Sequence, residues 1–172
     1  MEQRRSYGYY LQGELNTALR CAEQGLKMQK DTELPFFLPT HHYNLSSIKF
    51  DLGEMSEAEF HVAEALRIAQ ENNIKQAEGV AWIQLGRIAG RKGGSQLSKA
   101  EKHLLNGMKI LDEMKIKPFY AGGYLFLGEL WAEAGQKERA QESLKQAEEL
   151  FQQMGMDYWL ARTRNILGRL QG

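Results

Sequence analysis

A glycine recurs along this chain at intervals of 40, 40 and 42 residues. An alanine follows each of these glycines, so two residue types keep nearly one period over four cycles. The four pairs are Gly13 with Ala18, Gly53 with Ala58, Gly93 with Ala100, and Gly135 with Ala140. Such a pattern indicates an internal repeat. The chain is therefore expected to consist of copies of one short unit, which bury their apolar side chains against one another.

The segment from residue 119 to residue 154 shows this unit most clearly. It predicts two helices joined by a turn at Gly135, because its apolar and small residues fall on one face of each helix. These residues are Tyr124, Leu127, Gly128 and Trp131 on the first helix, and Ala140, Leu144 and Ala147 on the second. Gly128 and Ala140 are small, so the two helices are expected to approach closely there. The unit is thus a helix–turn–helix.

These spacings resemble the tetratricopeptide repeat (TPR) family, whose pattern is W-x2-L-G-x2-Y followed by A-x3-F. The copies that match best read Trp82-x2-Leu85-Gly86 then Ala100-x3-Leu104, and Tyr124-x2-Leu127-Gly128 then Ala140-x3-Leu144. An earlier copy has Leu45-Ser46 in place of Leu-Gly. The family repeat has roughly 34 residues, whereas this one has about 40, so each helix should be about one turn longer. The length resembles that of the long repeats in bacterial multidomain signalling proteins.

The resemblance implies an all-α fold, in which four antiparallel helix–turn–helix repeats and a C-terminal capping helix form a right-handed superhelix. The repeats are expected at about residues 1–34, 35–73, 74–116 and 117–155, with the capping helix at 156–171. Together they would form a single domain over residues 1–172, which is expected to be a fragment of a larger protein. Helical periodicity places the helices at about 2–11, 14–30, 37–52, 55–72, 74–92, 97–115, 118–134, 137–154 and 156–171.

Two finer predictions concern helix ends and the cap. Ser56 and Glu59 have the spacing of a capping box at the start of a helix. A capping helix should turn a polar face to solvent and an apolar face to the last repeat. The polar candidates are Arg162, Arg164 and Arg169, and the apolar ones are Trp159, Leu160, Ile166 and Leu170.

The charge balance excludes some classes of partner. Lys and Arg number 22, and Asp and Glu also number 22. This formal neutrality argues against binding to nucleic acid or to an anionic membrane through bulk charge. The chain has one cysteine, no apolar run of membrane-spanning length and no secretory signal, which favours a cytoplasmic protein.

Catalysis and metal binding have little support in the sequence. Cys21 lies among small residues of a predicted helix, which favours a packed thiol over a nucleophile. His41 and His42 are adjacent and would point about 100° apart on a helix, so they should not hold one metal ion together. His61 and His103 belong to different repeats, and no third ligand has a recognisable spacing. We therefore expect neither an enzyme nor a metal or cofactor site.

The resemblance implies a binding surface, because the first helices of TPR-like pairs line a concave face. The tentative peptide-binding residues on that face are Tyr43, Asn44, Ser47, Phe50, Gln84, Arg87, Arg91, Phe126, Glu129, Glu133, Arg162 and Arg169. A wider set adds Tyr7, Tyr10, Asp51, Ile83, Leu125 and Asn165. The family mode that grips a C-terminal carboxylate with Lys and Asn matches only at Asn44, which places chaperone-tail binding in doubt.

The charged residues of this set allow two interpretations. Arg87 and Arg91 are one turn apart, as are Glu129 and Glu133 on the next first helix. They could form a ladder of ion pairs, Arg87 with Glu129 and Arg91 with Glu133, or the arginines could hold an acidic peptide group. The well-placed glutamates favour the ladder.

The leading functional hypothesis is a non-catalytic scaffold that binds a protein or peptide partner on the concave face. The alternative is an effector-sensing regulatory module of a multidomain bacterial signalling protein, such as a transcription regulator, an ATPase or a nucleotide cyclase. A pocket closed on several sides with converging polar groups would favour the alternative, and an open groove would favour the scaffold. Homo-oligomerisation through exposed repeat ends is a third hypothesis.

Overall fold

The computed structural model describes residues 2–30 and 35–171. Within these residues every regular element is a helix, and no strand is present. The α-helices are α1 Glu2–Leu11, α2 Leu15–Lys30, α3 Leu38–Asp51, α4 Met55–Glu71, α5 Lys75–Lys92, α6 Leu97–Glu113, α7 Lys117–Glu133, α8 Lys137–Met154 and α9 Asp157–Gln171. Two short 3-10 turns, η1 Pro35–Phe37 and η2 Gly94–Gln96, precede α3 and α6.

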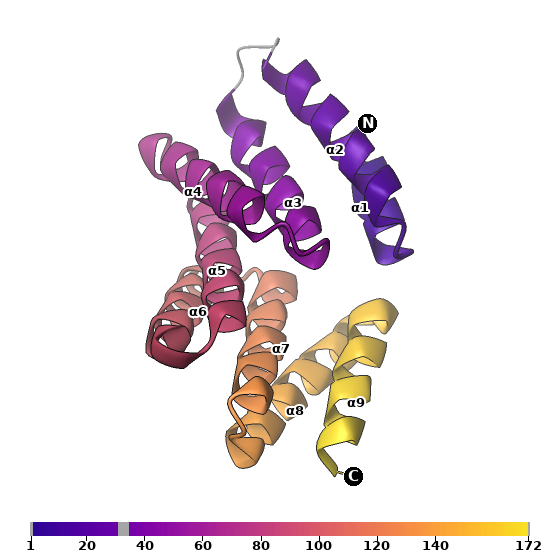
Figure 1. Ribbon diagram of the computed structural model, residues 1–172, viewed down its shortest axis with the longest axis vertical. Coiled ribbons are helices and arrows are strands. Elements are labelled where there is room, and N and C mark those ends of the chain that lie inside the picture. The colour runs from indigo at the N-terminus through magenta and orange to yellow at the C-terminus, as the bar shows by residue number, and fades with distance from the viewer. Residues whose placement is uncertain (1, 31–34, 172) are drawn as a thin grey trace.

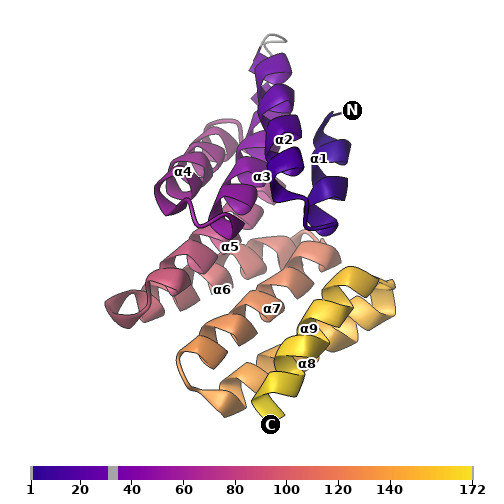
Figure 2. The ribbon, with the colours of Figure 1, turned by 45° about the vertical axis from the view of Figure 1, so that its right-hand side comes forward.

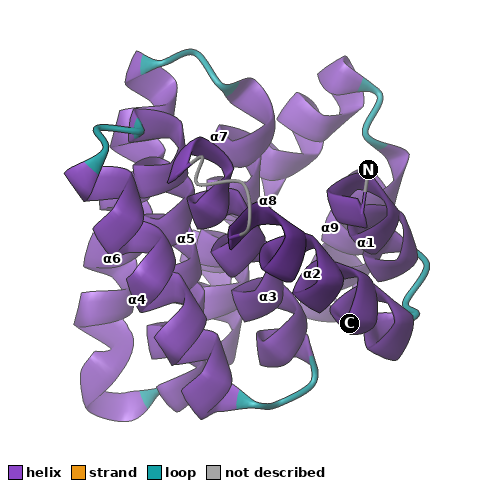
Figure 3. Ribbon diagram, turned by 90° about the horizontal axis from the view of Figure 1, so that it is seen from above, coloured by secondary structure: helices purple, strands orange, loops and turns teal. Residues whose placement is uncertain are grey.

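Consecutive helices pack as antiparallel pairs, and the pairs stack into a right-handed superhelix that ends in α9 (Figure 1). The view from above shows the same helices with short connections between them (Figure 3). This confirms the predicted all-α superhelix, and each predicted helix lies within two residues of the observed one. No helix among the described residues combines the length and apolar character needed to cross a membrane.

The two helices of a pair meet where the sequence has its small residues. A side chain built at Gly128 would lie 2.4 Å from Cγ of Leu144, and one built at Gly86 would lie 2.6 Å from Cγ of Leu104. Both leucines are fully buried. The predicted close approach at Gly128 is therefore correct, and the same contact recurs one repeat earlier.

The first two repeats make this contact with serine instead of glycine. The hydroxyl of Ser6 donates a hydrogen bond to the carbonyl oxygen of Ala18 over 2.9 Å, and that of Ser46 to Ala58 over 2.8 Å. Both serines are buried. Ser46, which departs from the family pattern, thus keeps the same small contact and adds a hydrogen bond.

The turns follow the predicted positions, but the predicted capping box is wrong. Gly53 and Gly135 have positive φ angles of 82° and 72°, which glycine adopts without the strain of a Cβ atom. Helix α4 begins one residue before Ser56, and its N-cap residue, Glu54, makes no side-chain capping hydrogen bond. Ser56 is therefore a residue of the first helical turn, so it cannot be the cap.

The last helix covers the final pair in nearly the predicted way. Trp159, Leu160, Ile166 and Leu170 are partly buried against the core, as expected. Thr163 and Leu167 are the most deeply buried residues of α9. Arg164 and Arg169 are exposed, whereas Arg162 is half-buried and turns towards α7. The prediction that Arg162 faces outward is therefore wrong.

Two histidines lie in surroundings that oppose their charge. Burial lowers the pKa of His41, and burial together with Lys99 and Lys102 lowers the pKa of His103. The folded chain then binds fewer protons than the unfolded chain, so the free energy of unfolding should fall as the pH drops below about 6.5. Thermal unfolding at about pH 7.5 and about pH 5 tests this. The His41→Gln/His103→Gln variant should lose less stability than the wild type, and an equal loss would contradict the prediction.

Candidate functional site

The inner helices α1, α3, α5, α7 and α9 enclose a cavity of about 630 Å³ near their N-terminal halves. Residues of η1 and one residue of α8 complete its wall. The described lining residues are Arg4, Tyr7, Phe36, Phe37, Pro39, Thr40, Tyr43, Asn44, Ile74, Gln76, Ala77, Val80, Ile83, Pro118, Phe119, Gly122, Phe126, Phe151, Met156 and Trp159. The cavity volume falls within the range of about 300–1,000 Å³ that is typical of ligand pockets.

Aromatic side chains gather at this cavity and stay accessible to solvent. Phe36, Phe37, Tyr7 and Phe119 are 60%, 48%, 45% and 36% exposed, although each is a large apolar residue. Deeper in the cavity, Phe126 is buried. A group of exposed aromatics around a recess is uncommon on a protein surface without a binding role.

The first and the last inner helix meet beside the cavity. The indole Nε1 of Trp159 in α9 donates a hydrogen bond to the hydroxyl of Tyr7 in α1 over 3.3 Å, across 152 positions of the chain. Figure 2 shows α1 and α9 on the same side of the molecule, with α1 above α9. The Trp159 ring also stacks on Phe151 with a centroid distance of 6.2 Å and meets the edge of Phe126 at 6.4 Å. This contact bridges α1 and α9 at one side of the cavity.

Next to the cavity, a buried arginine lies between two aromatic rings. The Arg87 guanidinium carbon is 4.6 Å from the ring centre of Phe50 and 4.2 Å from that of Phe126. Its Nη1 donates a hydrogen bond to Oε1 of Gln84 over 2.9 Å, and its Nη2 lies 3.5 Å from Oδ1 of Asp51. Desolvated cation–π contacts of this kind contribute about 2 kcal/mol. Arg87 therefore joins α3, α5 and α7.

Asp51 also accepts a hydrogen bond from the other side. The hydroxyl of Tyr10 in α1 donates to Oδ2 of Asp51 over 2.5 Å. Burial, with Asp51 as a further contribution, raises the pKa of Tyr10 well above its ordinary value. Tyr10 therefore stays protonated and remains a donor at neutral pH. This bond ties α1 to α3, and the same carboxylate contacts Arg87 of α5.

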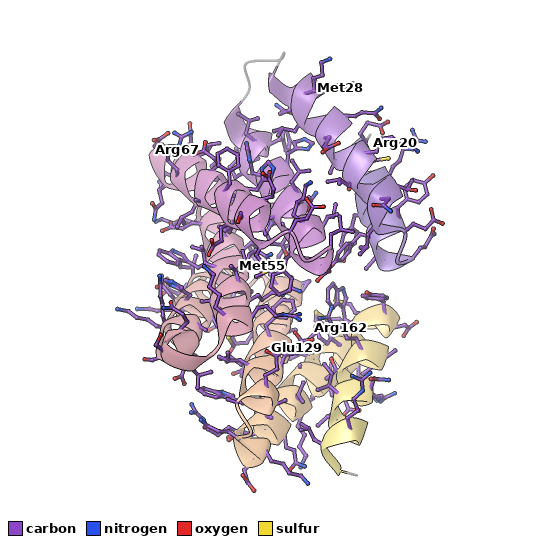
Figure 4. The ribbon with its side chains drawn as sticks, viewed as in Figure 1. Arg20, Met28, Met55, Arg67, Glu129 and Arg162 are labelled. Atoms are coloured by element: carbon purple, nitrogen blue, oxygen red, sulfur yellow. The ribbon has the colours of Figure 1, made fainter. Side chains whose placement is uncertain are left out.

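A second ion pair lies between the last two inner helices. Nε and Nη2 of Arg162 donate to the same oxygen of Glu129, over 3.0 and 2.7 Å, and Figure 4 shows the two side chains facing each other. Burial opposes the charge of Arg162, but the nearby carboxylate of Glu129 outweighs it and keeps the pKa of Arg162 raised. The charges thus alternate from α3 to α9 in the order Asp51, Arg87, Glu129, Arg162, which we call the polar belt.

The predicted ion-pair ladder is wrong in both of its pairs. Arg87 pairs with Asp51 of the preceding inner helix, and Glu129 pairs with Arg162 of the following one. Arg91 lies 5.1 Å from the ring centre of Phe50, and no ion pair between it and Glu133 occurs in the described part of the chain. Charges do alternate between neighbouring inner helices. The pairs differ from the prediction by one helix, because Glu129 pairs with an arginine of α9 and Arg87 pairs with Asp51 of α3.

The predicted peptide-binding residues fall into separate groups. Tyr43, Asn44 and Phe126 line the cavity, and Gln84, Arg87, Phe50, Glu129 and Arg162 belong to or touch the polar belt. Arg91 and Glu133 line a minor cleft of about 30 Å³, which adjoins the polar belt. Ser47 is buried, and Arg169 is exposed and lines neither recess. In the wider set, Tyr7 and Ile83 line the cavity, whereas Leu125 is fully buried, so its expected position on the open face is wrong.

Most residues in the N-terminal part of the cavity are absent from the predicted set. Val80 lies seven residues before Arg87, and Phe119 seven residues before Phe126, so each pair shares one helix face. Extending the period of the predicted residues by two turns would have found Val80 and Phe119. The pattern of α9 assigns Trp159 only to the core, and no local pattern signals Phe36 and Phe37, which lie on η1.

The residues with catalytic or metal-binding potential lie outside this site. Cys21 is a buried free thiol. The Nδ1 atoms of His42 and His61 lie 3.0 Å apart between α3 and α4, so they pair with each other. The described residues include no group of three or more His, Cys, Asp or Glu side chains that could hold a metal ion.

No protein-family model matches this chain, and no curated protein matches it. Fold comparison, in contrast, finds solved structures with the same arrangement of helices. The similarity is therefore one of architecture.

The chain superposes on aspartyl phosphate phosphatase F from Bacillus subtilis with a TM-score of 0.71 at 19% identity, over 96% of this chain and 43% of that one. It superposes on BtubC from P. vanneervenii with a TM-score of 0.68 at 20% identity, over 96% of this chain and 68% of that one. For a thermophilic TPR protein from Thermus thermophilus the TM-score is 0.57 at 23% identity, over 97% and 89% of the two chains. The chain thus has a TPR-like fold, and it spans less than half the length of the phosphatase.

Proposed function

We propose that this TPR-like superhelix is a non-catalytic scaffold that binds a segment of a partner protein on its inner face. The observation that supports the proposal is the group of exposed aromatics around the cavity, formed by Tyr7, Phe36, Phe37 and Phe119. Monomeric proteins seldom leave such a group uncovered, and aromatic residues are enriched in protein interfaces. The cavity is the anchor site of the segment in this proposal.

The mode of binding follows from the two parts of the inner face. Apolar side chains of the segment would enter the cavity and contact Phe126, Val80 and Ile83, which form its apolar wall. Burying one large apolar side chain contributes about 1.5–3 kcal/mol. The polar belt lies at the inner end of the cavity, where Arg87 and Arg162 are already paired. It would therefore fix the shape of the inner face and supply little binding energy itself.

Gly122 offers a direct test, because it lines the cavity and has room for a side chain. A Cβ atom at Gly122 would have only an ordinary contact of 3.8 Å with Phe126. Gly122→Leu should therefore extend an apolar side chain into the cavity with no clash at its Cβ atom, and it removes a glycine from a helix interior, which stabilises by up to about 1 kcal/mol. Peptides selected from a random library on the immobilised wild-type chain should bind this variant about tenfold more weakly or worse.

Gly168→Leu is the matched control. Gly168 lies in the interior of α9, is exposed and has no atom within 4 Å of a built Cβ. It makes the same chemical change away from the cavity, so the selected peptides should keep their affinity. Failure to enrich any peptide, or equal binding to Gly122→Leu and wild type, would refute the proposal.

Further parts of the proposal concern the protein as a whole. We place the chain in the long-repeat variety of TPR-like proteins, as a cytoplasmic domain over residues 1–172 of a larger signalling protein. The alternative function, an effector-sensing module, is favoured by one observation, the bridge between Tyr7 and Trp159 at one side of the cavity. Its walls carry few polar groups, which is why the scaffold remains our first proposal.

A further inference from the structure

The cavity is unevenly charged although the whole chain is neutral. Among its described lining residues Arg4 is the only one with a formal charge, and none carries a carboxylate. Arg4 is exposed, and no ion pair of its guanidinium occurs in the described residues, whereas the neighbouring Arg5 pairs with Glu2 at 3.1 Å. Two acidic groups of the inner face, Asp51 and Glu129, are held in the polar belt, and a third, Glu133, lines the minor cleft and not the cavity. An apolar recess whose one charged wall residue is a cation without an ion pair to any described residue favours an anionic ligand.

The helix directions add to this potential. The first turns of α3, α5 and α7 contribute Thr40, Gln76 and Phe119 to the cavity wall. These helices begin without side-chain caps, because their N-cap residues are Phe37, Ile74 and Ile116. No N-cap side chain of these helices therefore accepts a hydrogen bond from the first N–H groups, and the positive ends of three helix dipoles lie at one recess, with Glu78 in the first turn of α5 as the one acidic residue among these first turns.

We infer that the cavity binds a small amphipathic anion, a molecule with an apolar aromatic or aliphatic body and one anionic group. The apolar body would lie against Val80, Ile83 and Phe126, and the anionic group would face Arg4. A volume of about 630 Å³ accommodates a ligand of drug-like size. This inference goes beyond the peptide-binding proposal and does not depend on it, because it concerns a ligand that binds without any partner protein.

Two fluorescent probes that differ in one group test the inference. Anilinonaphthalene sulfonate and phenylnaphthylamine share an aromatic body, but only the first carries a sulfonate. Titration of the wild-type chain should give one site, with tighter binding of the sulfonate probe. Arg4→Gln should lower the affinity for the sulfonate probe about fivefold and leave the affinity for the neutral probe unchanged. Arg5→Gln, next to it but outside the cavity wall, should change neither.

The location of the probe is tested with the glycine variants. Gly122→Leu should abolish binding of both probes, and Gly168→Leu should leave both unchanged. Decanoate should displace the bound sulfonate probe at lower concentration than decanol does, because decanol lacks the charge. The inference is overturned if the two probes bind equally well, if Arg4→Gln has no effect, if decanol competes as well as decanoate, or if Gly122→Leu still binds the sulfonate probe.

Discussion

Gly107→Ala is expected to lower the free energy of unfolding by about 3 kcal/mol, although it adds only one methyl group. Helix α6 approaches α5 so closely at this residue that a Cβ atom would lie 2.4 Å from the carbonyl oxygen of Gly79. It would also lie 2.9 Å from the backbone nitrogen of Ile83. Both atoms belong to the backbone of α5, so no side-chain rotation can relieve the overlap. The two helices must separate, and the apolar contacts around them weaken.

Urea unfolding followed by circular dichroism measures this effect. Gly168→Ala is the control, because it makes the same change in a helix interior where a Cβ meets no atom within 4 Å. There the gain in helix propensity should stabilise the chain by up to about 1 kcal/mol. A Gly107→Ala variant as stable as the wild type would show that α5 and α6 do not approach each other as described.

Phe151→Ala is expected to cost about 4 kcal/mol. Phe151 is 1% exposed, belongs to the largest core cluster and stacks on Trp159. Its removal leaves a void beside the cavity and takes away the support of α9. Because the void joins the cavity, the variant should also bind the neutral phenylnaphthylamine probe with altered affinity, which links core packing to the site.

The control for this variant is Phe60→Ala. Phe60 is 58% exposed, so its truncation should change the free energy of unfolding by less than about 1 kcal/mol. The two variants are compared by urea unfolding under identical conditions. Equal effects of Phe151→Ala and Phe60→Ala on the free energy of unfolding would contradict the burial of Phe151 between α8 and α9.

The fold was predictable because each repeat has nearly the same spacing of small and apolar residues. Gly128 and Leu144 meet as their spacing indicates, and the turn at Gly135 lies where the helical period breaks. The role of Ser46 was not predictable from the pattern, since a serine can replace glycine only where its hydroxyl reaches a carbonyl group. That requirement depends on the distance between two helices, which a single sequence does not contain.

The site was predictable only in part, and for a similar reason. Periodicity identifies the face of a helix, and Phe126, Arg87 and Glu129, which it predicts to share one face with their neighbours, line the recesses between the inner helices. It does not say which neighbour each charge meets, and the pairing of Glu129 with Arg162 depends on how far α9 rotates against α7. The cavity itself needs a meeting of α1 with α9, which no local pattern encodes.

The contact between Tyr7 and Trp159 also restricts how a partner can arrive. The bond joins the side chains of the first and last inner helices, so a partner laid across the inner face from this side would have to break it. Entry past Phe36, Phe37 and Phe119 leaves the bond intact. A free chain terminus or a narrow hairpin suits that route better than a helix fixed in the middle of a rigid domain.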